Sequence, residues 1–253
     1  MKSFFVFILF SALLYAQTPI LIEVIVDTDT TIMDDIERQI LTHVIDIKNK
    51  KENTHYTYQI KALPFDQIFH YLNYKTIGDK KHTVLAISTI TVTDERKKQF
   101  DFSVPYIPAK SVIFTSAKNK EISSTSWMAP GSVIGVQKKT THESVLNTLL
   151  KQYPIKKETS PDYGHLMQRL LDDKIVYMLG DNVEIWNDTS LRILYTLDFQ
   201  KGTDIAIMYP KGSKLKDEFD KYLKYYIHSS KFFQLIRDKY GSDVSKYFRE
   251  NLR

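Results

Sequence analysis

Cysteine is absent from the chain of 253 residues, which excludes disulfide bonds, thiolate metal sites and a cysteine nucleophile. Basic stretches with interleaved aromatic residues are also missing, so the net charge of +5 does not indicate nucleic-acid binding. Beyond the N-terminal apolar run, no segment is long and apolar enough to cross a bilayer. The composition that remains, 43% hydrophobic and 26% charged, is typical of a folded globular protein.

Sequence motifs of catalytic and metal sites are missing as well. The seven histidines are scattered without a His-Glu-x-x-His spacing, and there is neither a Gly-x-Ser-x-Gly elbow nor a glycine-rich phosphate loop. His142, Glu143 and Glu184 are candidates for a general acid or base, but none of them stands in a diagnostic motif. We therefore predict a protein that is not an enzyme and that uses no metal or cofactor.

The apolar run that is present occupies residues 1–16. It has one lysine, a hydrophobic stretch and then Ala16 before Gln17, a pattern typical of a cleaved secretory signal peptide. The run is short for a membrane-spanning helix; a buried strand and a membrane anchor are the alternative interpretations. Because no cysteine follows the run, a lipid anchor is not expected, and we predict an exported protein without one.

The first hundred residues alternate between strand and helix patterns. Residues 20–26 and 83–88 are apolar runs and residues 56–63 alternate in polarity, so all three are predicted strands. A helical spacing of apolar residues follows Thr31, a candidate N-cap, and Pro64 opens a second helix. This β-α-β-α-β order predicts a mostly parallel sheet with helices on its faces.

The second half of the chain repeats this order and therefore predicts a second α/β lobe. Ser160 is the expected N-cap of its second helix, with Pro161 at the first helical position. The predicted strands lie at 132–137, near 154–158, at 174–180 and at 191–197, and the predicted helices at 141–153 and 161–173, with a helical turn at 183–188 and a helical tail at 213–250.

Two segments, 103–115 and 201–213, look like connections between the lobes. A chain that leaves one lobe, builds a second and returns makes two crossings, which suits a hinged clamp with its ligand site in the cleft. Such a clamp forms its site within one chain, so we expect a monomer. The predicted organisation is a signal peptide at 1–16, the first part of lobe 1 at 17–107, lobe 2 at 108–202 and the return of lobe 1 at 203–253.

A single arginine, Arg96, stands in an acidic turn within the segment "TITVTDERKKQFDFSVPY", which is too polar for a core strand and too rich in Thr and Asp for a good helix. Its planar guanidinium offers a fork of donors that suits a carboxylate. Thr91 can add its hydroxyl or its backbone N–H. The alternative is that Arg96 forms an ion pair with Asp94 or Asp101 on a solvated turn. Such an exposed ion pair contributes little to stability.

Polar residues in the second lobe complement Arg96. Thr140 and Thr141 begin a predicted helix, where free N–H groups and the positive end of the helix dipole favour an anion. Asp181 ends a predicted strand, at the edge where ligands lie in open α/β sheets, and can receive an ammonium group. The alternatives are that Thr140 is a helix cap and that Asp181 caps the turn that follows it.

Four segments resemble the amino-acid type of extracellular solute-binding proteins, family 3, which feed ABC importers. The sharpest match is "TITVTDERKKQFDFSVPY", similar to the Thr-x-Thr, Arg, Asp-Phe-Ser and Pro-Tyr signature of that family. The others are "VIGVQKKTT", "DDKIVYMLGDN" and "DIAIMYPKGS", in matching order and spacing. The resemblance implies the two-lobed periplasmic binding protein fold of type II, an α/β fold whose lobes are joined by two crossing strands.

The resemblance also implies roles for individual residues. It places Arg96, Thr91 and Thr140 on the α-carboxylate of an amino acid and Asp181 on its α-ammonium group. It further makes Thr89 a backbone acceptor and Phe65 an aromatic contact of the ligand side chain, although an aromatic residue at a helix start more often packs into the core.

The implied function is capture of a small polar, carboxylate-bearing solute in the periplasm, for a membrane permease of an ABC importer or for a sensor. The lobes would close on the ligand by a population shift. Two alternatives remain. One is a dehydratase- or lyase-like enzyme on the same scaffold, and the other is an interaction protein that has lost its ligand.

The chain departs from the family pattern in two places. The aromatic, Pro-Pro-Phe-like loop after the first strand is missing, and Asp27 and Asp29 lie near its place as a loop and cap or as a site for a cationic side chain. Thr89 and Lys139 stand at positions where family members have glycine. The backbone of Lys139 is strained if that position needs a positive φ. These departures indicate either a ligand other than a standard amino acid or a degenerate site.

Overall fold

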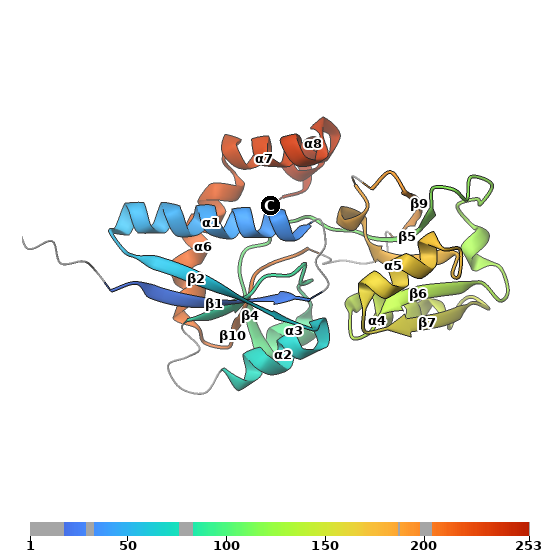
Figure 1. The fold of residues 1–253 in the computed structure, drawn as a ribbon, viewed down its shortest axis with the longest axis horizontal. Coiled ribbons are helices and arrows are strands. Elements are labelled where there is room, and N and C mark those ends of the chain that lie inside the picture. The colour runs from blue at the N-terminus through green and yellow to red at the C-terminus, as the bar shows by residue number, and fades with distance from the viewer. Residues whose placement is uncertain (1–17, 29–32, 76–82, 187, 198–203, 253) are drawn as a thin grey trace, which may run out of the picture.

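The computed structural model describes residues 18–28, 33–75, 83–186, 188–197 and 204–252. These residues form two α/β lobes that lie side by side, with the N-terminal and C-terminal segments in one lobe and the middle of the chain in the other (Figure 1). The predicted signal at 1–16 and the predicted cap Thr31 lie outside the described residues. None of the described helices combines the length and the apolar character needed to span a bilayer.

The sheet of lobe 1 has the strand order β2-β1-β3-β10-β4. The three predicted strands are confirmed as β1, β2 and β3, and they are parallel to one another where they pair. Strand β10, from the returning segment, pairs antiparallel with β3 and β4, so the sheet is mixed. The bounds are β1 (Ile20–Asp27), β2 (Tyr56–Leu63), β3 (Val84–Ala86), β4 (Phe100–Phe102) and β10 (Met208–Pro210).

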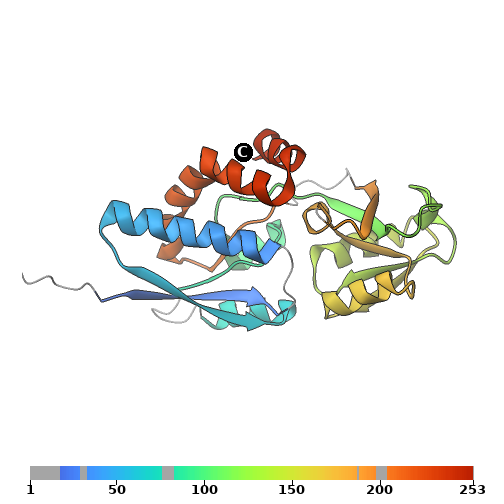
Figure 2. The same cartoon turned by 45° about the horizontal axis from the view of Figure 1, so that its top comes forward.

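Helices cover both faces of this sheet, because the apolar side chains of β1 point alternately to one face and to the other and both faces must be buried. Ile22, Val24 and Val26 point into a core shared with α1 and the C-terminal helices, whereas Ile25 points into the core under α2. The C-terminal helices lie on the same side of the sheet as α1 (Figures 1 and 2). The bounds are α1 (Met33–Glu52), α2 (Phe65–Tyr74), α3 (Asp94–Gln99), α6 (Lys214–Ile227), α7 (Ser230–Tyr240) and α8 (Ser242–Asn251).

Lobe 2 is built in the same way around a mixed sheet of order β7-β6-β8-β5-β9. Strands β7, β6 and β8 are parallel where they pair, and β5 is antiparallel to both of its neighbours. The bounds are β5 (Ser111–Ser116), β6 (Val133–Gln137), β7 (Lys156–Ser160), β8 (Tyr177–Asp181), β9 (Leu191–Thr196), α4 (Thr141–Leu149), α5 (Tyr163–Leu171) and the 3-10 turns η2 (Ser126–Met128) and η3 (Asn182–Glu184).

The two crossing segments lie against each other between the lobes. Ile205 of the returning segment bridges Ile107 of the outgoing one, and it also bridges Thr91 of lobe 1. Next to this crossing, Trp186 of lobe 2 packs against α8 of lobe 1, with ring centroids 5.4 Å from Tyr247 and 5.5 Å from Phe248. The lobes therefore meet at a hinge that is stiffened by backbone bridges and by aromatic packing.

Three local predictions are wrong. Residues 94–99 form the short helix α3, because Thr93 caps it by accepting the N–H of Arg96 at 3.1 Å. The N-cap of α5 is Asp162, whose carboxylate accepts the N–H of His165 at 2.7 Å, while Ser160 ends β7. Pro64 is the N-cap of α2 and not its first helical residue.

Candidate functional site

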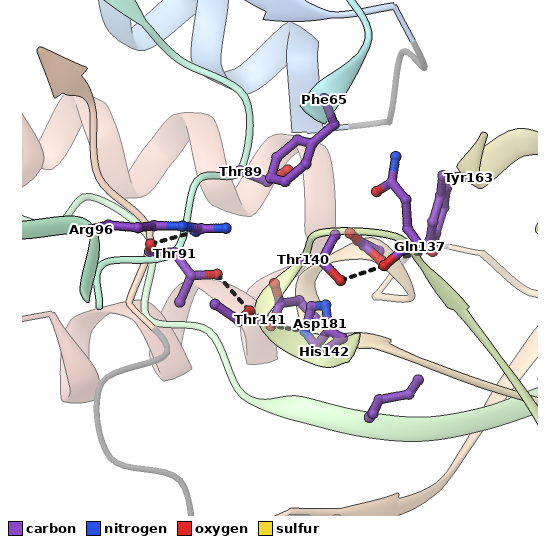
Figure 3. Close-up of a pocket in the computed structure, with 12 residues that line it drawn as sticks. Phe65, Thr89, Thr91, Arg96, Gln137, Thr140, Thr141, His142, Tyr163 and Asp181 are labelled. Carbon is purple, nitrogen blue, oxygen red and sulfur yellow. Dashed lines mark hydrogen bonds and ion pairs between the residues drawn. The ribbon is translucent and has the colours of Figure 1, made fainter. Parts of the chain in front are cut away.

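A cavity of about 30 Å³ lies between the lobes (Figure 3). Its volume equals that of one to two water molecules, so an amino acid needs the lobes to separate before it can enter. The lining comes from α3 and the loop before it, the starts of α2, α4 and α5, the carboxyl ends of β6 and β8, and η3. All seven predicted ligand residues are in the lining, which consists of Phe65, Thr89, Thr91, Arg96, Gln137, Thr140, Thr141, His142, Tyr163, Leu179, Asp181 and Glu184.

Arg96 forms the charged part of the lobe 1 wall. Its Nη1 donates to the carbonyl oxygen of Thr91 at 2.8 Å, and its guanidinium carbon lies 4.7 Å from the ring centre of Phe69 and 5.8 Å from that of Phe65. Burial lowers the pKa of Arg96 to about 10, an effect that the negative charge of Asp181 opposes. The guanidinium is thus held in the cavity with a fixed orientation and keeps its charge at neutral pH.

The alternative of a solvated ion pair for Arg96 is wrong. Asp94 pairs with Lys97 at 3.4 Å and Asp101 pairs with Lys211 at 2.8 Å, and neither aspartate lines the cavity. The carboxylate that acts on Arg96 is that of Asp181, across the cleft.

Phe65 and Thr89 complete the lobe 1 wall. Phe65 is buried and packs edge-on against Phe69 with ring centroids 5.4 Å apart, so it belongs both to the core and to the cavity lining. Thr89 has a φ of 45°, in the left-handed region, and its N–H donates to Oε1 of Glu37 at 2.7 Å. This hydrogen bond holds the loop that carries Thr91 and leads to Arg96.

In lobe 2, Thr140 is the N-cap of α4. Its hydroxyl accepts the N–H of Glu143 at 3.3 Å and donates to the carbonyl of Gln137 at 2.7 Å. The predicted cap is therefore confirmed, and it leaves Thr140 in the cavity lining. Thr141 begins the helix, and its hydroxyl lies 3.3 Å from that of Thr91 in the opposite lobe. The N-terminus of α4 thus faces the wall that carries Arg96 (Figure 3).

The floor of the cavity in lobe 2 is a cluster of four ionisable groups. Asp181, at the end of β8, does not cap η3 with its side chain; its Oδ1 lies 3.1 Å from Nε2 of His142. Burial alone would lower the pKa of His142, but the charge and the hydrogen bond of Asp181 outweigh it and raise that pKa. Beside this pair, the hydroxyl of Tyr163 donates to Oε2 of Glu184 at 2.7 Å.

Glu184 has the most perturbed carboxyl group of the site. Burial raises the pKa of Glu184 to about 7, and the negative charge of Asp181 adds to the effect, while His142 and the hydrogen bond from Tyr163 oppose it. Burial and the neighbouring carboxyl likewise raise the pKa of Tyr163, which therefore stays a hydrogen-bond donor. The floor thus offers two carboxyl groups, one of which titrates near neutral pH.

Lys139 connects the lobes at the mouth of the cavity. Its φ is 61°, so the positive φ considered from the sequence is present, and its N–H donates to Oε2 of Glu143 at 2.8 Å. Its Nζ reaches Oδ2 of Asp66 in lobe 1 at 3.2 Å. An outer groove of about 560 Å³ begins here and shares Arg96, Thr140 and Thr141 with the inner cavity.

Asp27, one of the two aspartates considered from the sequence, does not add to the described lining. Asp27 is the buried last residue of β1, its N–H donates to Oγ of Ser88 at 2.9 Å, and it is not among the residues that line the cavity. Asp29 lies outside the described residues. Within the described parts of the chain, no group of three or more His, Asp and Glu side chains could hold a metal ion.

Five lining residues were not predicted to bind ligand: Gln137, His142, Tyr163, Leu179 and Glu184. Gln137 ends β6 beside β8, so the rule that ligands lie at the carboxyl ends of parallel strands points to it. His142 and Glu184 were identified from the sequence only as acid–base candidates. Nothing in the sequence near Tyr163 indicated that α5 begins at the cavity.

Comparison with known proteins identifies the family of this architecture. The model of "Bacterial extracellular solute-binding proteins, family 3" matches residues 45–243. An arginine-binding periplasmic protein of Mannheimia haemolytica is 28% identical over 72% of this chain and 70% of its own length. The arginine-binding extracellular protein ArtP of Bacillus subtilis is also 28% identical, over 67% of this chain and 65% of its own length.

Solved structures agree on the fold. An amino acid ABC transporter substrate-binding protein of Streptococcus pneumoniae, bound to L-arginine, superposes with a TM-score of 0.68 at 21% identity, covering 89% of this chain and 96% of that chain. The two mixed sheets, the paired crossings and the interlobe cavity make this the type II periplasmic binding protein fold. The chain belongs to the bacterial extracellular solute-binding proteins of family 3.

Proposed function

We propose that this protein is a non-catalytic binding protein that closes its lobes on an amino acid or a related small solute bearing a carboxylate. The observation that carries the proposal is the placement of Arg96. Its guanidinium is stacked on Phe69 inside the interlobe cavity and uses one donor on the carbonyl of Thr91. A guanidinium has five N–H donors, so the group retains enough of them for a bidentate contact with a carboxylate.

The carboxylate would lie between Arg96 and the start of α4. Thr91 stands on the lobe 1 side of this place, and Thr140 and Thr141 on the lobe 2 side, with their hydroxyls in the lining. The first N–H groups of a helix have no partners within the helix, and they favour an anion. An anion at this place touches both lobes and therefore stabilises the closed arrangement over the open one.

The ammonium group would lie against Asp181, with the backbone carbonyl of Thr89 as a further acceptor. Asp181 is buried at the end of β8 and faces the positive charge of Arg96 across the cavity. A zwitterion inserted between these two side chains presents each of its charges to the opposite charge of the protein. Phe65 would then contact the side chain of the ligand.

The names of the relatives support an amino acid, and arginine first, as the ligand. Both proteins reported above at 28% identity are named as arginine-binding, and both are binding proteins, which also supports a non-catalytic role. We further propose export through the segment at 1–16 to the periplasm, without a lipid anchor, and delivery of the solute by a monomer to the permease of an ABC importer.

Thermal denaturation with added ligands tests the proposal. A ligand that binds only the folded protein raises its melting temperature, so a panel of amino acids, amines and carboxylates is screened at one pH. We expect arginine or another amino acid to raise the melting temperature, and we expect Arg96→Ala to remove this rise while leaving the unliganded melting temperature nearly unchanged. An Arg96→Ala variant that unfolds much earlier yet keeps its response to ligand would contradict the proposal.

A further inference from the structure

We propose that Glu184 is an additional ligand contact and that it selects solutes with a second cationic group, such as the guanidinium or amine of a basic amino acid side chain. The inference rests on the proposed function, because it assigns a subsite of the same cavity. It places the recognition of the second charge on the floor of lobe 2, next to Asp181.

The position of Glu184 makes this contact geometrically possible. The residue ends η3, one turn after β8, and it lines the cavity together with Tyr163 and Gln137. Its Oε2 occupies space that a side chain at Gly180 would take, because a Cβ built there would lie 2.8 Å from that oxygen. The glycine at position 180 therefore gives the carboxyl group room beside the floor of the cavity.

The charges of the cavity leave Glu184 without a counterpart in a simple zwitterion. Arg96 matches the carboxylate of an amino acid, and Asp181 matches its ammonium group. His142 is hydrogen-bonded to Asp181, and Tyr163 is a neutral donor to Glu184. A carboxylate accepts about four hydrogen bonds, so the bonds from the Tyr163 hydroxyl and from the backbone of Asp181 leave capacity for a cationic donor. A second positive charge on the solute would neutralise the carboxylate of Glu184.

The acid–base behaviour of Glu184 gives the subsite a pH dependence. The groups that face it are Asp181 from β8, His142 from α4, Tyr163 from α5 and, across the cavity, Arg96. Its pKa is raised to about 7 by burial, and a cation beside it favours the ionised form. Binding of a dicationic solute therefore releases a proton below pH 7, and the affinity rises as the pH increases through 7.

Titration calorimetry with arginine and citrulline tests the proposal, because citrulline has the same length and an uncharged end group. For the wild type we expect arginine to bind more tightly than citrulline, and its affinity to rise roughly tenfold from pH 6 to pH 8, the change in ionised fraction of a group with a pKa of about 7. We expect the affinity for citrulline to stay flat. Titrations in buffers of different ionisation enthalpy should show proton release only with arginine.

The Glu184→Gln variant should lose both the preference for arginine and its rise with pH, and keep its affinity for citrulline. Glu121→Gln removes one exposed charge from the same lobe and should behave as the wild type. Equal losses for arginine and citrulline in Glu184→Gln, or an unchanged ratio and pH slope, would overturn the inference and leave the proposed function standing. Failure of the wild type to bind either ligand, or any other amino acid, would instead overturn the proposed function.

Discussion

At the scale of a single residue, Lys139 has a strained backbone conformation and makes two hydrogen bonds at the mouth of the cavity. A φ of 61° is unfavourable for a residue with a side chain and costs about 1 kcal/mol relative to glycine. In return, the backbone N–H of Lys139 bonds Glu143, and its ammonium group bonds Asp66 in the opposite lobe. The conformation therefore directs an ion pair across the mouth of the cleft.

Two substitutions at position 139 separate these effects. Lys139→Ala should keep the backbone strain and lose the ion pair, and Lys139→Gly should lose both. We expect both variants to bind ligand up to about fivefold more weakly, since exposed ion pairs contribute at most about 1 kcal/mol. We expect the glycine variant to be more stable than the alanine variant by about 1 kcal/mol.

Urea denaturation and calorimetric titration with arginine measure the two quantities. Lys138→Ala is the matched control, because Lys138 is an exposed neighbour whose charge is not part of the pair, and it should change neither quantity. A glycine variant that is less stable than the alanine variant would contradict the strain at this position. Wild-type affinity in both variants would contradict a role of the ion pair in closure.

At the scale of elements, the carboxyl ends of β6 and β8 build the floor of the site. Their alignment depends on close packing against β6 of Met178 in β8 and of Ile175 just before it, and Gly135 in β6 allows this packing. A Cβ built at Gly135 would lie 2.6 Å from Cδ1 of Ile175, 3.2 Å from Cγ of Met178 and 3.5 Å from Cδ2 of Leu166. The strand therefore has no space for a larger residue at this position without movement of its neighbours.

We expect Gly135→Ala to lower the free energy of unfolding by about 1–3 kcal/mol, the usual cost of overpacking a core. Gly164→Ala in α5 is the control, because its Cβ would only approach Oδ1 of Asp162 at 3.4 Å and alanine favours a helix. Urea denaturation of both variants provides the measurement. Gly135→Ala as stable as the wild type would show that Ile175 and Met178 are not packed against β6 as described.

The elements differ in how well the sequence predicts them. Strands such as β1 and β2 were predicted correctly because the polarity of a strand repeats every two residues, and long helices because apolar residues recur every three or four. Helix α3 was missed because its six residues, Asp94–Gln99, are all polar and only the cap at Thr93 marks it. The cap of α5 was misplaced by two residues because Ser160 and Asp162 both suit that role.

At the scale of the whole molecule, the hinge and the site depend on contacts between segments far apart in the chain. The sequence predicted two crossings, and it predicted seven residues that all lie in one cavity lining; their roles in binding stay predictions. It did not predict that Trp186 of lobe 2 packs on α8 of lobe 1, or that α5 brings Tyr163 to the floor. Such contacts follow from how the lobes pack, which no local pattern encodes.

The central claim is that the two lobes close on a carboxylate held by Arg96. The most direct test is to titrate the wild type with arginine and with agmatine, which is arginine without its carboxylate. Loss of charge-assisted hydrogen bonds, each contributing about 1.5–3 kcal/mol, predicts that agmatine binds at least about tenfold more weakly than arginine. Agmatine that binds as tightly as arginine would contradict the claim.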